Sequence, residues 1–211
     1  MNILNYEYFE KLNLAYKDPS RLMHKKMRIV LDYVKQGESL IDIGCGTGEF
    51  IFQLRKRFDK VVGIDTSSHA IEFAGRRVGE DKGISLECGE LDSFQFPSED
   101  FDVCLCLDVL EHVRSVYPLV KEIFRILRPD GEIIVTVPNW YDIITTRILR
   151  RRSFHVHTMT PWNWMGLLKR AGFRIRFYRA VEFPLVKSDF LARKIPILGM
   201  CIFIVAIKKG C

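Results

Sequence analysis

The sequence lacks three kinds of segment: internal repeats, an N-terminal signal peptide, and an apolar run of the roughly 20 residues that a membrane-spanning helix needs. The longest uncharged apolar stretch covers 13 residues, Ile195–Ile207, and predicts a buried strand. These absences argue against a solenoid, a secreted protein and a helical membrane protein. With 211 residues, 27% of them charged, the chain is expected to form a single cytoplasmic domain over residues 1–211.

Cysteine is present, but without the spacing of a metal site. The six cysteines are Cys45, Cys88, Cys104, Cys106, Cys201 and Cys211. Cys104 and Cys106 form a close pair, yet they lie inside an apolar run and no second ligand pair accompanies them. We therefore expect reduced structural thiols, no disulfide framework and no metal.

Acidic residues are scarce in the last third of the chain. The net charge is +6, from 32 Lys and Arg against 26 Asp and Glu. Residues 1–139 carry 18 basic and 23 acidic residues, a net −5, whereas residues 140–211 carry 14 and 3, a net +11. The C-terminal part is therefore expected to face an anionic partner or substrate.

Short apolar strands alternate with amphipathic helices through most of the chain. Seven strands are expected, at residues 39–43, 60–65, 84–88, 101–107, 132–137, 174–182 and 201–208. This alternation predicts an α/β fold: a Rossmann-like seven-stranded sheet, mostly parallel with an antiparallel last strand, with helices on both faces.

Two helix ends are predicted from apolar spacing and turn residues. Phe50, Ile51, Leu54 and Phe58 mark a helix after the first strand. A later helix from Val116 keeps its apolar spacing as far as Leu127, and residues 128–131 are expected to break it before the fifth strand.

A glycine-rich turn, residues 44–48, follows the first strand at the position where open parallel sheets bind ligands. Glycines there let a ligand approach the backbone, and the following helix N-terminus favours an anionic group. The spacing is G-x-G-x-G. A G-x-G-x-x-G dinucleotide motif would have glycine at position 49, where this chain has Glu49, so that a pyrophosphate would meet an acid. Asp42, just ahead of the turn, also suits a positively charged ligand better than one with two phosphates. The turn therefore favours a cofactor that carries positive charge over a dinucleotide.

An ordered series of motifs over residues 38–139 resembles the class I S-adenosylmethionine (SAM)-dependent methyltransferases, most closely those of ubiquinone and menaquinone biosynthesis. The segments that carry the resemblance are residues 40–48, 62–65, 89–97, 101–103, 111–113 and 127–132. The resemblance implies a cofactor-binding core at 38–139. Around it, apolar spacing and helix caps predict N-terminal helices at 1–37 and a C-terminal helix and strands at 161–211, with a substrate-side insert expected at 140–160.

The resemblance also implies which residues bind SAM. The methionyl part is expected at the glycine turn with Asp42 near its ammonium, the ribose hydroxyls on Asp65, and the adenine amino group on Glu90, where the family usually has Asp. The full set of expected cofactor residues is Asp42, Gly44, Cys45, Gly46, Gly48, Asp65, Thr66, Glu90, Leu91 and Asp108. Taken singly, these acids also fit helix caps and solvated loops.

Methyl transfer from a sulfonium needs alignment and exclusion of water more than it needs a strong base. If a base acts, His155 and His157 are the expected catalytic residues, because imidazole changes charge near neutral pH and both follow the Arg-rich insert. Surface or capping histidines are the alternative reading of both.

The expected reaction is in-line transfer of the methyl group to a small-molecule acceptor, anionic or lipid-linked. The Arg147–Arg152 region fits an anionic substrate, an anionic membrane surface or RNA, and the sequence indicates no obligate protein partner. RNA or protein methylation is an alternative, although Leu107-Asp108-Val109-Leu110 stands where amino-methylating enzymes carry an Asn-Pro-Pro-Tyr-like tetrad. A non-catalytic SAM-binding module is the other alternative.

Overall fold

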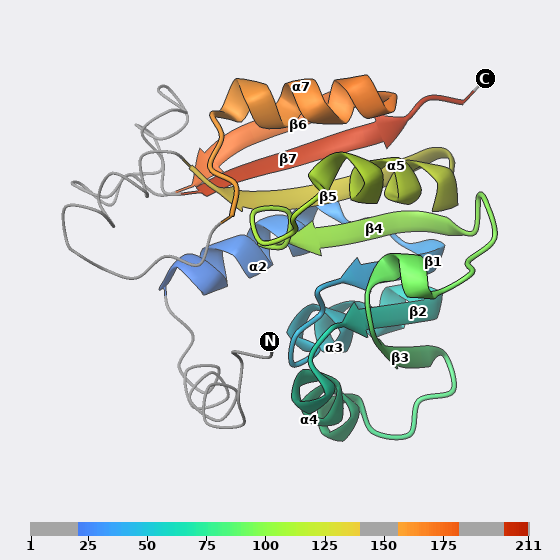
Figure 1. Ribbon diagram of the computed structural model, residues 1–211. Coiled ribbons are helices and arrows are strands. Elements are labelled where there is room, and N and C mark those ends of the chain that lie inside the picture. The colour runs from blue at the N-terminus through green and yellow to red at the C-terminus, as the bar shows by residue number, and fades with distance from the viewer. Residues whose placement is uncertain (1–20, 140–155, 182–200, 211) are drawn as a thin grey trace.

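The computed structural model describes residues 21–139, 156–181 and 201–210 (Figure 1). In these ranges one sheet has the strand order β3-β2-β1-β4-β5-β7-β6. Its strands are β1 (Gly37–Ile43), β2 (Phe58–Asp65), β3 (Ile84–Cys88), β4 (Phe101–Leu107), β5 (Leu127–Pro138), β6 (Phe173–Val181) and β7 (Cys201–Lys208). Strands β1 to β5 are parallel, and β7 runs antiparallel to β5 and β6. The predicted seven-stranded sheet with an antiparallel last strand is confirmed.

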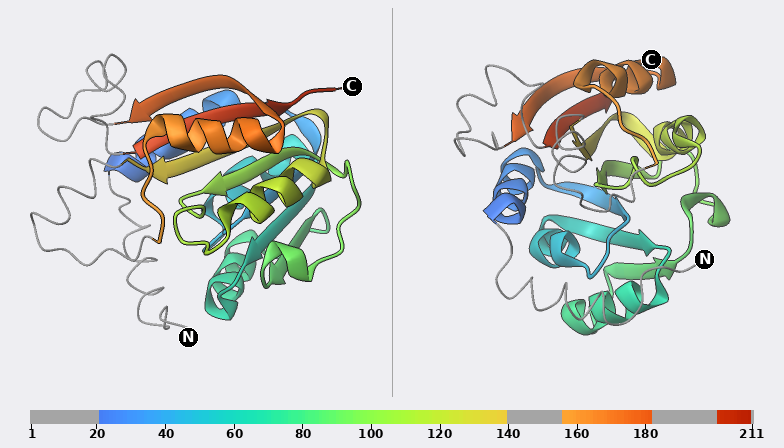
Figure 2. Two further views of the ribbon diagram at one scale, coloured as in Figure 1. Left: turned by 45° about the horizontal axis from the view of Figure 1, so that its top comes forward. Right: turned by 60° about the vertical axis from the view of Figure 1, so that its left-hand side comes forward.

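Helices cover both faces of this sheet, as the sequence predicted (Figure 2). They are α2 (Arg21–Tyr33), α3 (Glu49–Leu54), α4 (Ser68–Val78), α5 (Val116–Ile126) and α7 (Pro161–Ala171), with short 3₁₀ turns η1 (Arg55–Arg57) and η2 (Leu91–Ser93). On one face α5 and α7 bury Ile123 and Trp164 against the sheet. On the other, α2 and α3 bury Val30 and Ile51. Among the described helices, none is both long enough and apolar enough to cross a bilayer.

The prediction that the helix after β1 extends to Phe58 is wrong. Helix α3 ends at Leu54, η1 follows, and Phe58 begins β2 opposite Gly37 of β1. The side chain of Phe58 is buried against the same core as Leu54. The apolar spacing from Phe50 to Phe58 therefore spans two elements, α3 and β2. Its residues Leu54 and Phe58 pack in the same hydrophobic core although they belong to different elements.

The predicted break at residues 128–131 is also wrong in kind, because these residues lie within β5. Leu127, expected on the preceding helix, is fully buried and pairs with Phe101 at the start of β4. The register then moves from Phe101↔Leu127 to Val103↔Glu132, and Asp130 takes a positive φ of 62°. The turn residues thus form a bulge inside the strand, a role that local sequence does not distinguish from a loop.

The strand order reverses beside β1. From β1 the chain builds outward through β2 to β3, then crosses to β4 on the other side of β1. In open parallel sheets, ligands bind beyond the carboxyl ends of the strands that flank such a reversal, here β1 and β4. The glycine turn at residues 44–48 begins there.

Candidate cofactor and acceptor site

The glycine turn is tied to the end of the neighbouring strand. The amides of Gly44 and Cys45 both donate to the carbonyl of Ile64 in β2, at 2.8 and 2.9 Å. Gly44, Gly46 and Gly48 have φ values of 74°, 54° and 74°, a region that side chains with a Cβ rarely adopt. The turn is therefore fixed in a left-handed backbone path that the glycines make possible.

Two of these glycines are also required by close packing. A Cβ on Gly44 would lie 2.3 Å from Cγ2 of Val109, and one on Gly48 would lie 2.9 Å from Cβ of Ala74. A Cβ on Gly46 would meet no atom within 4 Å. The middle of the turn therefore borders open space, where a ligand can reach the backbone.

Asp65, at the end of β2, holds the turn from the other side. Its Oδ2 accepts the Gly46 amide and its Oδ1 accepts the Ser67 amide, each at 2.9 Å. Burial raises the pKa of this carboxyl, while the two N–H donors act against that rise. Each carboxylate oxygen keeps a second lone pair for another donor, so Asp65 can still accept two ligand hydroxyls.

Asp42 is buried in β1 directly below the turn. It is 2% exposed, and its Oδ2 has no hydrogen-bond partner. Burial, together with the negative charge of Asp65, raises the pKa of Asp42 to about 8. A buried acceptor without a donor is costly, and a cation or N–H donor placed at the turn would relieve that cost.

The segment after β3 reaches the same edge. The Gly89 amide donates to the carbonyl of Asp65 at 3.0 Å, which brings Glu90 and Leu91 beside the end of β2. The side chain of Glu90 is exposed and that of Leu91 is buried at the start of η2. Thr66, next to Asp65, is exposed. The expected adenosine-binding residues therefore converge on one region of the sheet edge.

Asp108 follows β4 and contacts Lys26 and Thr136. Neither of these two residues was expected at the site from the sequence. Its Oδ2 lies 2.5 Å from Nζ of Lys26 in α2, and its Oδ1 accepts the Thr136 hydroxyl of β5 at 2.9 Å. Burial opposes ionisation of Asp108, but Lys26 and Thr136 together hold its pKa below the usual value. The Asp108 carboxylate in turn outweighs the burial of Lys26 and raises the lysine's pKa. The pair is therefore ionised at neutral pH.

A signal for Lys26 was present in the sequence. It precedes Val30 and Val34 by four and eight residues, so it lies on the apolar stripe of α2. A lysine on such a stripe is either exposed at a helix end or paired. Here it is 8% exposed and reaches the carboxyl edge of the sheet.

Glu111, in the loop after β4, is a buried acid that was not among the site residues expected from the sequence. It is 1% exposed, its Oε2 has no hydrogen-bond partner, and burial together with Asp108 raises its pKa to about 8. Its main-chain carbonyl accepts the amides of Val156 and His157, at 2.7 and 3.0 Å. Residues 156 and 157 are thereby attached to the loop after β4.

His157 lies at this attachment. Its Nε2 is 3.1 Å from the carbonyl of Arg114, which leaves Nδ1 as the acceptor nitrogen when Nε2 carries the proton. The structure therefore brings His157 to the carboxyl edge, near the loop that carries Asp108 and Glu111. His155 and the Arg147–Arg152 region lie outside the described residues.

Buried cysteines pack in the hydrophobic cores on the two faces of the sheet. Cys45, Cys104 and Cys106 are buried free thiols and Cys88 is an exposed one, while Cys211 lies outside the described residues. Burial raises the pKa of Cys45, Cys104 and Cys106, so all three stay protonated. In the described ranges, His, Cys, Asp and Glu side chains form no group of three that could hold a metal ion.

Comparison with known proteins finds methyltransferases. Residues 41–135 match a methyltransferase domain family. The chain is 29% identical over 146 residues to phosphoethanolamine N-methyltransferase 1 of Arabidopsis thaliana, covering 66% of this chain and 29% of that protein. It is 28% identical over 147 residues to the ubiquinone biosynthesis O-methyltransferase of Actinobacillus pleuropneumoniae, covering 62% of each.

A solved structure shares the fold over nearly the whole chain. The S-adenosylmethionine-dependent methyltransferase of Mesorhizobium loti superposes with a TM-score of 0.69 at 21% identity, covering 89% of this chain and 98% of that one. The chain spans less than two thirds of the curated relatives it matches, and under one third of the plant enzyme. The matched family domain contains the glycine turn, Asp65 and Asp108, and the chain has the fold of the S-adenosylmethionine-dependent methyltransferases.

Proposed function

We propose that this protein binds SAM at the carboxyl edge of the sheet and transfers its methyl group to a small-molecule acceptor, anionic or lipid-linked. The observation that carries the proposal is the buried, unpartnered Oδ2 of Asp42 beneath an open glycine turn whose middle residue is held by Asp65. A ligand that pairs an ammonium with a vicinal diol fits this donor and acceptor set.

The residues present fit SAM at each of its parts. The Gly46 region leaves room for the methionyl group, and Asp42 would receive its ammonium directly or through water. Asp65 would accept the two ribose hydroxyls, and Glu90 with the Leu91 amide would contact the adenine. Cys45 and Thr66 would line the path between these contacts. The 38% exposure of the Asp108 side chain leaves it accessible to the methionyl side despite its pairing with Lys26.

When bound, SAM supplies an electrophilic methyl group on a sulfonium. The work left to the chain is to orient the acceptor, exclude water and take up its proton. We assign the acceptor side to the region between Asp108, Glu111 and His157, with Nδ1 of His157 as the atom that receives the proton. His155 remains the second proposed base.

The acceptor class is supported by the charge of the chain and by its relatives. Residues 140–211 carry a net +11, which favours an anionic acceptor or an anionic surface that presents it. The named relatives are a phosphoethanolamine and a ubiquinone-biosynthesis methyltransferase, one name indicating a phosphorylated acceptor and the other a lipid-linked one. Methylation of RNA or protein, and SAM binding without catalysis, are the alternatives.

Isothermal titration calorimetry with SAM, S-adenosylhomocysteine and NAD tests the cofactor. The Gly46→Arg variant should lose SAM binding, because its side chain would occupy the open space at the turn. Gly79→Arg is a matched control, since Gly79 also has a positive φ, of 68°, and open space around its Cβ, but ends α4. Undiminished SAM binding by Gly46→Arg would refute the assigned site.

Turnover assays test catalysis and the acceptor. The purified chain, without a protein partner, should methylate a phosphorylated amine or a lipid-linked phenol when given SAM. Replacing Arg150, Arg151 and Arg152 by alanine should raise the KM for an anionic acceptor and weaken pull-down on anionic vesicles or RNA, most clearly at low salt. SAM binding without turnover of any acceptor class would favour the binding-module alternative.

A further inference from the structure

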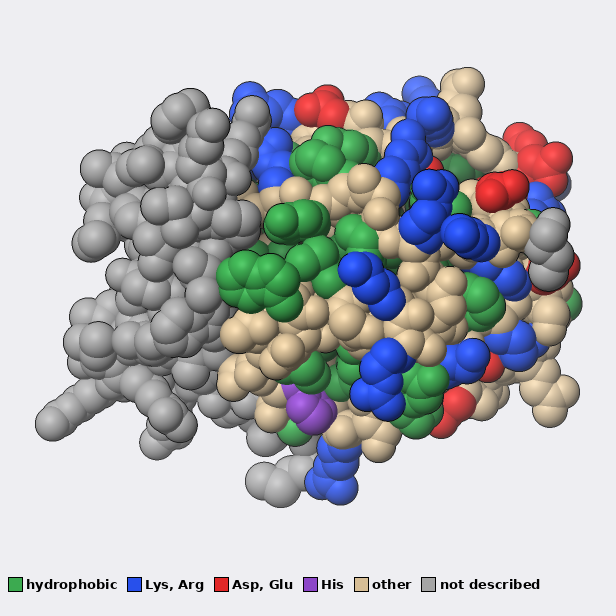
Figure 3. Space-filling model, turned by 90° about the horizontal axis from the view of Figure 1, so that it is seen from above, with side chains coloured by type: hydrophobic (Ala, Val, Ile, Leu, Met, Phe, Trp, Pro, Cys, Tyr) green, Lys and Arg blue, Asp and Glu red, His purple; other side chains and the backbone are tan. Residues whose placement is uncertain are grey.

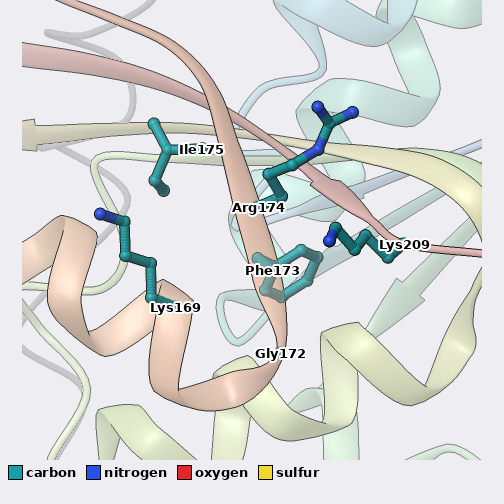
Figure 4. Close-up of a pocket in the computed structure, with 6 residues that line it drawn as sticks. All are labelled: Lys169, Gly172, Phe173, Arg174, Ile175 and Lys209. Atoms are coloured by element: carbon teal, nitrogen blue, oxygen red, sulfur yellow. The ribbon is translucent and has the colours of Figure 1, made fainter.

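A basic hollow lies at the opposite edge of the sheet from the cofactor site. It has a volume of ≈ 490 Å³ and is lined by Lys169, Gly172, Phe173, Arg174, Ile175 and Lys209 (Figure 4). These residues come from the end of α7, the start of β6 and the end of β7, where β5 also begins. The cofactor edge, by contrast, lies where β1, β2 and β4 end.

The three cations of the hollow have no acidic partner among the residues that the structure describes. Lys169, Arg174 and Lys209 enter no ion pair in those ranges, whereas the acids nearby are engaged: Glu132 pairs with Arg176, and Glu99 with Lys208. Asp130 lies beside Gly210 but also forms no ion pair there. The hollow therefore carries three cations without an ion-pair partner in the described residues, with the Asp130 carboxylate as the nearest acid that forms no ion pair.

The position of the hollow at a helix C-terminus raises an objection, because the carbonyls of a last helical turn repel anions. Here each of the last four carbonyls of α7 accepts a hydrogen bond. The Gly172 amide donates to the carbonyls of Leu168 and Lys169, the Tyr117 hydroxyl to that of Arg170 at 3.4 Å, and the Lys121 ammonium to that of Ala171 at 3.5 Å. The carbonyls at the negative end of the helix are thus satisfied within the protein.

Two of the three cations lie close enough in direction to meet one anionic ligand. In Figure 4 the side chains of Arg174 and Lys209 extend on one side of β6 and that of Lys169 on the other. Figure 3 shows Lys and Arg side chains gathered over the same face, away from the grey segments. Arginine matches phosphate oxygens in a bidentate geometry, and lysine adds a point charge. The volume lies within the range of small-ligand sites, about 300–1,000 Å³.

We propose that this hollow binds a small diphosphate-bearing ligand, of the size of inorganic pyrophosphate or a nucleoside diphosphate, at a site separate from the cofactor edge. Arg174 and Lys209 hold the phosphate groups on their common side of β6. The site goes beyond methyl transfer and does not depend on it.

Calorimetric titration of the full chain with inorganic pyrophosphate, at a salt concentration of about 20 mM where screening is weak, tests the proposal. The Arg174→Ser/Lys209→Ser variant should bind about tenfold or more weakly, since each cation at a partly exposed site contributes up to about fivefold. The matched control is Lys35→Ser/Lys82→Ser, which removes two exposed lysines away from the hollow and should change affinity by less than about twofold. SAM binding reports that all variants remain folded.

Three results would overturn the proposal. One is the absence of pyrophosphate binding at about 1 mM, the weak end of specific recognition. Another is an equal loss of affinity in the control variant, which would indicate diffuse attraction to the whole basic face. The third is binding of a short RNA or of phosphatidylglycerol vesicles that needs Arg174 and Lys209 but is not displaced by pyrophosphate, which would assign the face to a polyanionic partner.

Discussion

Replacing Lys26 by methionine should destabilise the protein by leaving Asp108 without its cation. Methionine has a similar length and suits a site that is 8% exposed, so little packing is lost. Breaking a fully buried ion pair costs about 3–5 kcal/mol. Because the Asp108 side chain is 38% exposed, and Thr136 still donates to it, we expect about 1–3 kcal/mol at pH 7.

The cost should depend on pH in a defined direction. In the parent protein the pKa of Asp108 is lowered, so the pair stabilises the fold above the carboxyl's unfolded pKa, and this contribution is lost as pH falls through the folded pKa. The raised pKa of Lys26 means that its contribution is complete below the unfolded lysine pKa and is lost only above it. The deficit of Lys26→Met should therefore be greatest between about pH 6 and 9 and should shrink near pH 4, where the unpaired Asp108 is protonated.

Reversible urea unfolding followed by circular dichroism, at pH 7 and pH 4.5, measures this deficit. Lys35→Met is the control, because Lys35 is exposed just beyond α2 and should change stability by less than about 0.5 kcal/mol. The double variant Lys26→Met/Asp108→Asn should be less destabilised than the sum of the single variants. A deficit below about 0.5 kcal/mol at pH 7, or one that does not change with pH, would refute the assignment of a stabilising pair.

Three further predictions concern the cofactor edge. The affinity for SAM should rise between pH 6 and 7.5, by at most about tenfold per pH unit. The reason is that a pKa of about 8 keeps Asp42 protonated in the free protein, whereas the ligand's ammonium favours the ionised carboxylate. Calorimetry should find no such pH dependence in Asp42→Asn. His157→Gln should lower kcat by about 10²–10⁴-fold with SAM affinity unchanged if His157 is the base, and full activity would exclude it. Gly44→Ala should lower the free energy of unfolding by about 1–3 kcal/mol through its φ of 74° and its clash with Val109, and Val109→Ala should restore part of the loss; no loss in urea unfolding would contradict the described turn.

The alternation of strands and helices could be predicted from the sequence, because the spacing of apolar residues within each strand and each helix is a local property. Residues 84–88, 101–107 and 201–208 are strands with the expected bounds. The errors fell where tertiary pairing overrides local signals. Phe58 fits a helical spacing but pairs with β1, and residues 128–131 carry turn signals yet remain in β5 because Leu127 pairs with Phe101.

The candidate site was readable to a different extent. The glycine turn, Asp42, Asp65 and Asp108 follow strands in order, so their common location at one edge follows from parallel topology. Lys26 and Glu111 could not be assigned in this way, because their roles depend on which helix lies over which strand end. The pairing of Lys26 with Asp108 joins residues 82 positions apart in the chain, and the carbonyl of Glu111 is contacted by residues 156 and 157.

The amides of Val156 and His157 are attached to the carbonyl of Glu111 by main-chain hydrogen bonds. Hydrogen bonds between main-chain groups need no particular side chain, and only proline, which has no N–H, is incompatible at positions 156 and 157. Whatever sequence joins the end of β5 to Val156, its return point on the loop after β4 is therefore preserved. Changes of sequence between Pro138 and Val156 should therefore leave this attachment to Glu111 in place.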